Sequence, residues 1–544
     1  MDRVLAEPEA TAHNHQLKGL DAVNFPSYTE GGPQTDEYTT ETPAGYMDEP
    51  LSHSTSLTAH SAGGIADEKG VKYKIVTFTE HDPENPRNKS VGKKWFQTLV
   101  VSFTCFAVAI GSSLIVMDME KAAIEFNCNI DIIHLTVTLF VFGFGIGPLF
   151  FAPLSEIAGR RPVIVVSMGL YFLFTFPSAF AHNKQTLVIG RALAGLSASA
   201  PMTVIGGSIA DLWDTKDRGL PMAIFSGTVF IGPVIGPVIA GFLTVKGWRA
   251  NYYLLLGISG AAWLLTTFFL PETYAVVILR KRAQKLRKET GDESYVTEQE
   301  LHKQPLSVVI KTSLVRPMQL LFTEPIVLLF TLYLSLIYAL LYLLFFAVPI
   351  VFGEIHGWPI GSIGLAFIPI LIGMMLTFGT VLPWQAKHYA RKNAECEANG
   401  TTVPPETRLP SMMVGSIVLP IGFFIFAWTS YSDVHWIAPC FGTALFGFAM
   451  IAIYVGANSY IVDSFSNYAA SAMAAKTFLT RLVGGAIPMF VDRLYHSRMQ
   501  PRWASCLLAL IATCMLPIPF VFYRYGSQIR AMSKRSGAGT PAGH

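Results

Sequence analysis

The sequence predicts an all-α integral membrane protein whose twelve transmembrane helices form two six-helix bundles. Three observations lead to this fold class. First, only 14% of the 544 residues are charged and 51% are hydrophobic, whereas soluble domains carry about 25% charged residues. Second, stretches of about 20 predominantly apolar residues, the length that crosses a bilayer, recur twelve times. Third, the longest connection between these stretches, residues 271–324, follows the sixth of them.

The apolar stretches define the expected spans. They are residues 95–117, 133–154, 163–181, 187–210, 221–244, 251–270, 325–352, 360–382, 409–430, 436–462, 471–490 and 503–523. The eleventh is the least certain span because it holds Lys476 and Arg481. Residues 1–93 are rich in polar residues, Gly and Pro and poor in aliphatic residues, so they cannot bury enough apolar surface to fold alone. We therefore expect a disordered tail there.

The distribution of Lys and Arg predicts the orientation, because cytoplasmic loops carry an excess of both. Loops on the same side as the termini hold about three times as many basic residues as loops on the other side. We therefore expect a cytoplasmic tail at 1–93, a cytoplasmic central loop at 271–324 and a cytoplasmic C-terminal tail at 524–544. The first bundle then comprises residues 94–270 and the second 325–523.

The central loop contains a run of basic residues at 280–288. An amphipathic helix with a basic face binds anionic lipid headgroups, so we expect this run to lie on the inner leaflet of the membrane. The alternative is a solvated linker.

Composition also disfavours several classes of function. A net charge of only +3 gives no field for nucleic acid. The six cysteines are scattered without a C-x-x-C pair, which argues against a zinc site or a disulfide framework. We find no cluster of metal ligands and no arrangement of nucleophile and base. The sequence therefore predicts neither an enzyme nor a bound metal or cofactor.

Three short motifs fall on the expected spans. Residues 152–161 (APLSEIAGRR) join spans two and three, residues 191–195 (RALAG) lie in span four, and residues 232–241 (GPVIGPVIAG) lie in span five. They resemble the signature loop G-x-L-a-D-r-x-G-R-R, the R-x-x-x-G pattern and the antiporter pattern G-x-x-x-G-P-x-x-G-G of the major facilitator superfamily. Ala and Glu replace the first Gly and the Asp of the first pattern, and Ala240 replaces a Gly of the third.

Other segments resemble one branch of that superfamily, the fungal twelve-span drug:proton antiporters, which include multidrug and polyamine exporters. These segments are 85–88 (NPRN), 207–211 (GSIAD), 247–249 (GWR) and 271–274 (PETY). The resemblance covers about 82–530. It departs in span eleven, where the family tends to have Asn-Thr with an Arg four residues after the Asn. This chain has Lys476-Thr477 and then Arg481, which weakens any transfer of substrate identity.

The resemblance implies a gating latch at the cytoplasmic ends of spans two to four. Its residues are Glu156, Gly159, Arg160, Arg161 and Asp211. In the family's arrangement the two arginines are close enough to the acid for charge-assisted hydrogen bonds, which form in the outward state and break in the inward state. The alternative is that both arginines only set the orientation of the chain.

Several residues are candidates for the pathway of substrate or protons. They are Arg191 and Gly195 in span four, Tyr338 and Tyr342 in span seven, and Lys476 and Arg481 in span eleven. A charge in lipid is costly, so we expect Arg191 to face the bundle interior, with snorkelling to the interface as the alternative. For Lys476 the alternative is an interfacial position, and for the tyrosines it is packing.

Span five carries the antiporter-like residues Gly232, Pro233, Gly236, Pro237 and Gly241. Small residues recur every four positions from 228 to 240, so one helix face is free of bulk. We expect a helix of the other bundle to pack closely there. In the family this seam is thought to seal leaks between states; the alternative is ordinary packing.

Together these patterns predict a proton-coupled secondary transporter that exports small amphiphilic organic molecules, such as drugs, toxins or secondary metabolites, by alternating access. Alternatives are an organic-anion or polyamine carrier and a non-transporting membrane sensor. The central spans hold cations and no obvious acid, which favours neutral amphiphiles or organic anions over polyamines. We expect a monomer in the plasma membrane, with the vacuolar membrane as the alternative, and as partners a small organic substrate, protons and lipids but no nucleic acid.

Overall fold

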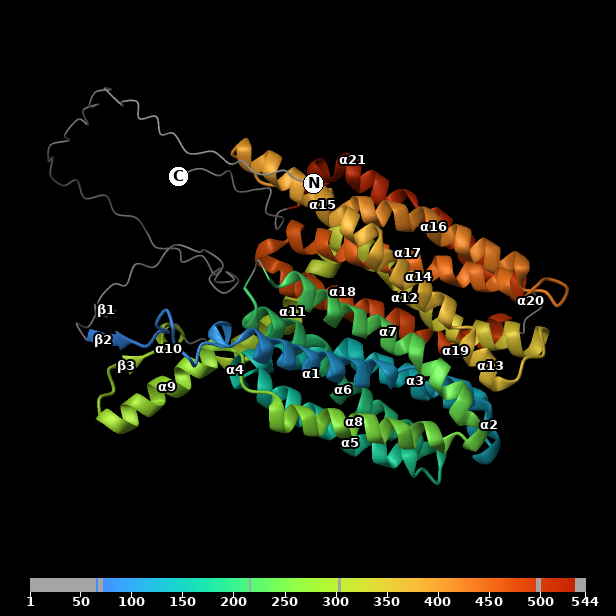
Figure 1. Ribbon diagram of the computed structural model, residues 1–544, viewed down its shortest axis with the longest axis horizontal. Helices are drawn as coiled ribbons and strands as arrows, with labels where there is room; N and C mark the ends of the chain where they lie inside the picture. The colour runs from blue at the N-terminus through green and yellow to red at the C-terminus, as the bar shows by residue number, and fades with distance from the viewer. Residues whose placement is uncertain (1–64, 67–71, 215–216, 302–304, 496–499, 534–544) are drawn as a thin grey trace, which may run out of the picture. The chain divides into compact units, whose positions relative to one another are not determined.

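The computed structural model describes residues 65–66, 72–214, 217–301, 305–495 and 500–533, and these are almost entirely helical (Figure 1). The helices of the first half are α1 (Val91–Ile110), α2 (Met119–Glu125), α3 (Ile130–Ile146), α4 (Pro148–Ala158), α5 (Arg160–Ala179), α6 (Lys184–Leu212), α7 (Gly219–Leu243) and α8 (Arg249–Phe269). The connection to the second half contains α9 (Ala275–Thr290), strand β3 (Tyr295–Val296), α10 (Glu298–Leu301) and α11 (Leu306–Thr323).

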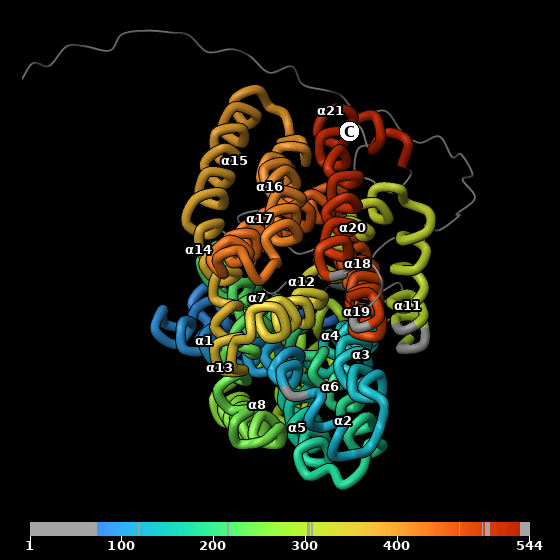
Figure 2. The backbone as a smooth tube through the Cα atoms, turned by 90° about the vertical axis from the view of Figure 1, so that its right-hand side faces the viewer, coloured from blue at the N-terminus to red at the C-terminus, as the bar shows by residue number. Residues whose placement is uncertain are grey.

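The second half runs in the order α12 to α21. Its helices are α12 (Pro325–Pro349), α13 (Ile360–Leu365), α14 (Ile368–Gly379), α15 (Val381–Ala398), α16 (Leu409–Thr429), α17 (Ile437–Ser464), α18 (Ala469–Ala486), α19 (Pro488–Tyr495), α20 (Gln500–Met515) and α21 (Pro517–Met532). A π-helical turn, Ile350–Ile355, extends α12. Figure 2 shows the helices of the two halves gathered on different sides, with α3, α7, α12 and α18 between them.

The fold class predicted from the sequence is confirmed, but hydropathy alone does not establish twelve crossings. Within the described residues nine helices are long and apolar enough to cross a membrane, and the pair α3 and α4, which is bent by 44°, would make a tenth. The other two predicted spans, α1 and α18, are helical but less apolar. Lys93 and Lys94 lower the hydropathy of α1, and Lys476 and Arg481 lower that of α18. The count of twelve therefore stays a prediction.

The first helix is shorter than its apolar stretch. The predicted span reached residue 117, but α1 ends at Ile110 and a series of turns leads to α2. Gly111, Ser112 and Ser113 follow directly, and these residue types favour turns over helix. Gly111 also lies where a Cβ atom would come within 2.2 Å of the Tyr171 hydroxyl, so only glycine fits at this break.

Part of the segment expected to be disordered has a defined structure. Strand β2 (Lys72–Ile75) pairs antiparallel with β1 (Ile65–Ala66) and parallel with β3 of the central loop. Lys74 Nζ lies 2.8 Å from an Asp292 oxygen, and Arg282 forms an ion pair with Asp82. We call residues 72–88 together with α9 and β3 the clasp. This part of the predicted tail is ordered because the central loop supplies partners that the tail alone lacks. Residues 1–64 and 67–71 of the predicted tail lie outside the described part.

The basic run of the central loop forms a helix as expected, but its arginines bind protein. Helix α9 includes the whole run, and Val277 and Ala283 are buried. Arg280 donates to the Ile157 carbonyl at 2.7 Å, and Arg287 donates to the Glu300 carboxylate at 2.9 Å. With Arg282 engaged by Asp82, this part of α9 is a protein contact in the structure.

The two ends of the bundles differ in how the halves meet. Residues 155–162, 211–214, 217–219 and 271–290 lie together at one end, which we call the basic end. Here α4 of the first half packs against α11. At the opposite end, Arg493 of α19 forms an ion pair with Asp131 of α3 at 3.0 Å, and α7 packs against α13.

Candidate functional site

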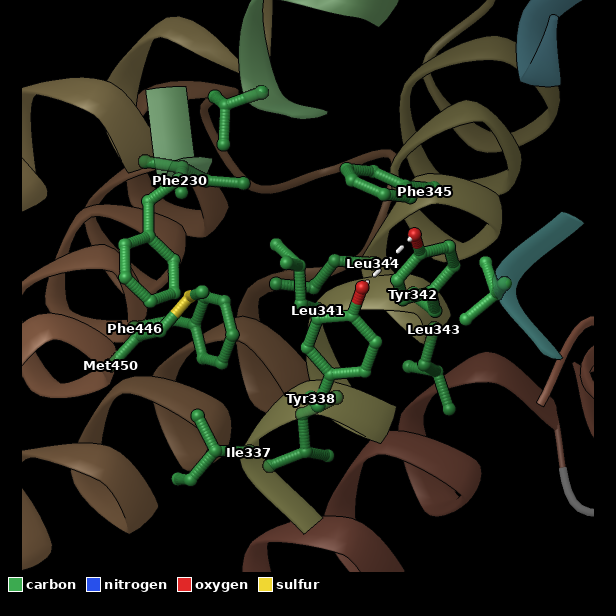
Figure 3. Packing of buried hydrophobic residues seen from close by; sticks show 14 of the residues in the cluster. Phe230, Ile337, Tyr338, Leu341, Tyr342, Leu343, Leu344, Phe345, Phe446 and Met450 are labelled. Carbon is green, nitrogen blue, oxygen red and sulfur yellow. Dashed lines mark hydrogen bonds between the residues drawn. The ribbon is translucent and has the colours of Figure 1, made fainter. Parts of the chain in front are cut away.

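A small cavity lies where the two halves meet. It is lined by Ala109 and Ser112 of α1, Phe144 of α3, Met202 of α6, Val229, Phe230 and Pro233 of α7, Tyr338 and Leu341 of α12, and Arg481 of α18. Its volume is about 10 Å³, which is room for one water molecule at most. We call it the central cavity. Figure 3 shows Phe230, Tyr338 and Leu341 packed close together in this region.

Arg481 reaches the central cavity and lies on an aromatic face. Its guanidinium carbon is 4.0 Å from the centre of the Tyr338 ring. The Tyr338 hydroxyl donates to the Tyr342 hydroxyl at 3.3 Å, and Tyr342 is fully buried (Figure 3). Three of the candidate pathway residues thus form one connected group.

Lys476 is buried beside this group. The residue is only 2% exposed, so it is buried within the protein, and its depth in the membrane stays a prediction. The ammonium donates to the Tyr454 hydroxyl at 3.3 Å. Tyr454 in turn packs edge-on against Phe230 of the first half, with ring centres 4.5 Å apart. Lys476 is therefore connected to the cavity wall through Tyr454.

The cations of this group have aromatic partners instead of acidic ones. Among the described side chains, no Asp or Glu forms an ion pair with Lys476 or Arg481. A charged side chain at the centre of a spanning helix costs at least about 2.5–3.5 kcal/mol. Phenol oxygens and ring faces offset part of that cost, so the central cavity keeps an excess of positive charge.

Arg191 lies inside the first half, and the snorkelling alternative is wrong. It is 1% exposed, and its guanidinium donates to the Gly111 carbonyl at 2.8 Å. The same group stacks on Phe140 at 3.9 Å. Because the last carbonyls of a helix lack helical partners and carry partial negative charge, Arg191 stabilises the point where α1 ends. It does not line the central cavity.

Gly195 forms a helix-packing contact and does not line the central cavity either. A Cβ atom there would come within 2.3 Å of the Phe140 carbonyl oxygen, and one at Gly143 would come within 2.4 Å of the Gly195 backbone. Helices α3 and α6 therefore cross at these two glycines. The contact explains the glycine without a role in the pathway.

The small-residue face of α7 packs within the first half, which corrects the expectation that the other half would fill it. A Cβ atom at Gly232 would meet Ala109 at 2.6 Å, and one at Gly236 would meet the Ser113 hydroxyl at 2.2 Å. Both neighbours belong to α1 and the turn after it. The row Gly232–Gly236 is therefore a seam inside one bundle.

The neighbouring row of α7 faces the other half. Pro233 lines the central cavity. One turn further, the Pro237 carbonyl lies 2.9 Å from the position of a Cβ at Gly364 in α13. A Cβ at Gly241 would come within 2.9 Å of the Ile360 carbonyl oxygen. The row Pro233–Pro237–Gly241 thus closes the contact between the halves at the opposite end.

The predicted latch residues meet at the basic end. Arg160 Nε lies 3.5 Å from an Asp211 oxygen, and the same guanidinium donates to the Ser155 hydroxyl at 2.8 Å. It also stacks on the Tyr274 ring at 4.7 Å. Burial, and then the charge of Glu156, raise the pKa of Tyr274, so this ring stays neutral under the arginine. Glu156 itself is exposed at the end of α4.

The sequence did not reveal the role of Glu272. Its carboxylate accepts hydrogen bonds from the backbone N–H groups of Arg160 and Arg161 at 3.0 and 3.2 Å, and from those of Thr273 and Tyr274, both at 3.0 Å. An anion at the first N–H groups of a helix satisfies unpaired donors and opposes the helix dipole. Glu272 therefore caps α5 from a distant part of the chain.

Gly159 and Arg161 also depend on this cap. Gly159 has φ +105°, a conformation that favours glycine. A Cβ atom there would lie 2.4 Å from the Glu272 carboxylate. Arg161 does not contact Asp211; it donates to the Thr267 carbonyl near the end of α8 at 3.1 Å. The two arginines therefore have separate partners.

A similar cluster lies at the start of α16 in the second half. Arg408 Nε is 2.8 Å from an Asp463 oxygen, and its guanidinium lies 3.4 Å from the centre of the Tyr389 ring. As in the first half, an arginine at the start of one helix pairs with an aspartate at the end of the next and stacks on a tyrosine. The two loops share no motif, so the sequence does not predict this repeat.

Two bundles of membrane-length helices around a shared cavity define a membrane transporter of the major facilitator fold. The comparisons agree: the family described as Major Facilitator Superfamily matches residues 101–489. The chain therefore belongs to the major facilitator superfamily.

Individual relatives support the same assignment. The chain is 44% identical to the transporter paaT of Penicillium rubens, over 92% of this chain and 88% of that protein. It is 41% identical to the major facilitator superfamily multidrug transporter mdrA of Aspergillus fumigatus, over 84% and 74% of the two chains. The inward open structure of the xylose transporter XylE from E. coli aligns with a TM-score of 0.55 at 16% identity, covering 78% of this chain and 95% of that one. This last likeness concerns the fold alone.

Proposed function

We propose that this chain exports small amphiphilic organic molecules in exchange for protons by alternating access. The observation that carries this proposal is the central cavity, which both halves line with aromatic rings, aliphatic side chains and one guanidinium. Amphiphilic molecules fit such a mixed lining. The relative named as a multidrug transporter supports transport of this class of molecule. We also propose that the protein is a monomer in the plasma membrane and that both of its termini are cytoplasmic.

The size of the central cavity requires movement of the halves. At about 10 Å³ it is far smaller than the roughly 300–1,000 Å³ of ordinary ligand pockets. Loading therefore needs the walls to separate. Seven of the lining residues belong to the first half and three to the second. Separation of α3 and α7 from α12 and α18 therefore opens the cavity.

The contact between α7 and α13 could open and close as a gate at the end opposite the basic end. Backbone atoms of Pro237 and Gly241 lie against α13 without intervening side chains. Glycine contacts of this kind close tightly and separate without breaking strong bonds. The ion pair between Asp131 and Arg493 joins the same end but is largely exposed, so it adds little.

We propose that the latch acts through the turn between α4 and α5. Its partners in the structure, Asp211, Glu272 and Tyr274, all belong to the first half or its final turn. The turn holds the end of α4, and α4 packs against α11, which leads into the second half. The latch thus sets the position of α4, the helix that contacts α11 at the basic end.

Accumulation in living cells tests the proposed function. The chain is expressed in a host deleted for its own exporters, and a broad panel of labelled compounds is measured with and without a protonophore. We expect lower accumulation of some compounds, reversed when the proton gradient collapses. Unchanged accumulation across the panel, with surface expression verified, contradicts export and supports the non-transporting sensor.

A further inference from the structure

The central cavity combines buried cations with an absence of buried acids. Elsewhere in the described structure, arginines at the bundle ends pair with carboxylates, as Arg408 does with Asp463. In the cavity region, Arg481 lies on Tyr338 and Lys476 binds Tyr454, and no described Asp or Glu pairs with either cation. Burial without an opposite charge leaves both cations poorly compensated. An anionic group that enters the cavity would supply what the protein lacks.

We propose, building on the transport function above, that the cargo is a small organic carboxylate whose charged group binds Arg481 and Tyr454. Arg481 lines the cavity, and its planar guanidinium matches a carboxylate in a bidentate arrangement. Stacking on Tyr338 fixes the plane of the guanidinium while its edge remains the donor surface.

Tyr454 supplies the second contact, and Lys476 positions it. The Tyr454 hydroxyl accepts a hydrogen bond from the Lys476 ammonium at 3.3 Å, so its own O–H is oriented to donate elsewhere. Its ring packs on Phe230, which lines the cavity. Lys476 therefore acts on the cargo through Tyr454 and through its charge.

The remaining lining selects an apolar body. Phe144, Phe230 and Tyr338 present rings to the cavity, and Met202 and Leu341 present flexible aliphatic surface. Rings stack on an aromatic cargo, and methionine adapts to its shape. A polyamine has the opposite charge and no such body, so the cavity disfavours it.

Reconstituted transport distinguishes the classes of cargo. The full chain is purified and placed in liposomes loaded with one of three fluorescent probes of equal shape: 2-naphthoate, 2-naphthamide or 2-naphthylmethylammonium. The same triad is repeated on a biphenyl scaffold, and liposomes without protein give the passive leak. We expect protein-dependent efflux of the carboxylates that exceeds that of the amides and ammonium compounds at least about tenfold.

Variants of Arg481 and Lys476 test whether these residues determine the selectivity for carboxylates. Arg481→Gln is expected to raise the KM for the carboxylates about 10- to 100-fold, and Arg481→Lys is expected to restore part of the loss. Lys476→Gln is expected to raise KM less, with recovery in Lys476→Arg. Arg502→Gln is the matched control, because Arg502 also binds a tyrosine, donating to the Tyr431 hydroxyl at 2.7 Å, but outside the cavity. It should leave transport unchanged.

The outcomes separate the two proposals. Efflux of the ammonium or amide probes at the rate of the carboxylates refutes the anion selectivity and keeps the transporter. Unchanged carboxylate transport in a folded Arg481→Gln variant refutes the binding site. Failure of every probe to leave faster than the passive leak contradicts both the carboxylate cargo and export. Thermal unfolding of each variant shows whether it remains folded.

Discussion

Glu272 offers a direct measurement of how the latch is held. The change is Glu272→Ala, which removes the carboxylate that accepts the N–H groups of Arg160 and Arg161. Loss of a helix cap costs about 0.5–2 kcal/mol, and loss of a charge near the helix N-terminus adds about 0.3–1 kcal/mol. A local cost of about 1–2 kcal/mol corresponds to opening about 5- to 30-fold more often.

Hydrogen exchange measures this opening at the amides themselves. Peptides that cover the start of α5 should exchange about 5- to 30-fold faster in Glu272→Ala, because each opening exposes the N–H groups to solvent. Glu289→Ala is the control, since the Glu289 side chain is exposed on α9 and pairs with Lys285. Exchange at the start of α5 that stays within twofold of the wild-type rate would refute the capping role.

Three further results are expected. Arg191→Gln should lower the unfolding temperature, because the arginine stabilises the end of α1, and lost transport without lost stability would instead favour a role in proton sensing. Gly241→Leu should slow transport without unfolding the protein, since the new side chain meets α13 when the halves close; normal turnover would contradict a gate there. The hydrogen bond from Arg282 lowers the pKa of Asp82. The contact therefore stabilises the clasp fully at any pH above the ordinary Asp pKa of about 3.9. This stabilisation is lost only as the pH falls through the lowered pKa. Exchange protection of β2, corrected for intrinsic rates, should therefore be unchanged between pH 8 and pH 5; a loss near pH 6 would contradict this.

Hydropathy and local motifs predicted the fold class and the burial of several charged residues. Arg191 is an example, because the cost of a charge in lipid allows few positions in a spanning helix. The limits of the helices were less predictable. Residues 111–117 are apolar enough to continue α1. The Gly-Ser-Ser sequence at 111–113 favours a turn, but the packing of Gly111 on Tyr171 becomes visible only in the structure.

The sequence did not predict which residues far apart in the chain contact one another. A period of four identified the small face of α7 but not the helix that fills it, and the structure places α1 there. In the clasp, the Lys74 side chain binds Asp292, 218 residues away, and β2 pairs with β3 through the backbone. Backbone pairing leaves no pattern in either segment. Tyr454 likewise became a candidate only when its hydroxyl was found beside Lys476.

We propose that the two halves separate and close around the central cavity during each transport cycle. Cysteines placed at Asp131 and Arg493, which meet across the halves at the opposite end, allow a short reversible bis-methanethiosulfonate reagent to hold that end closed. Each single-cysteine variant is the control for the native thiols. We expect cross-linking to stop efflux and a reductant to restore it. Full efflux from the cross-linked protein would show that this end need not open during transport.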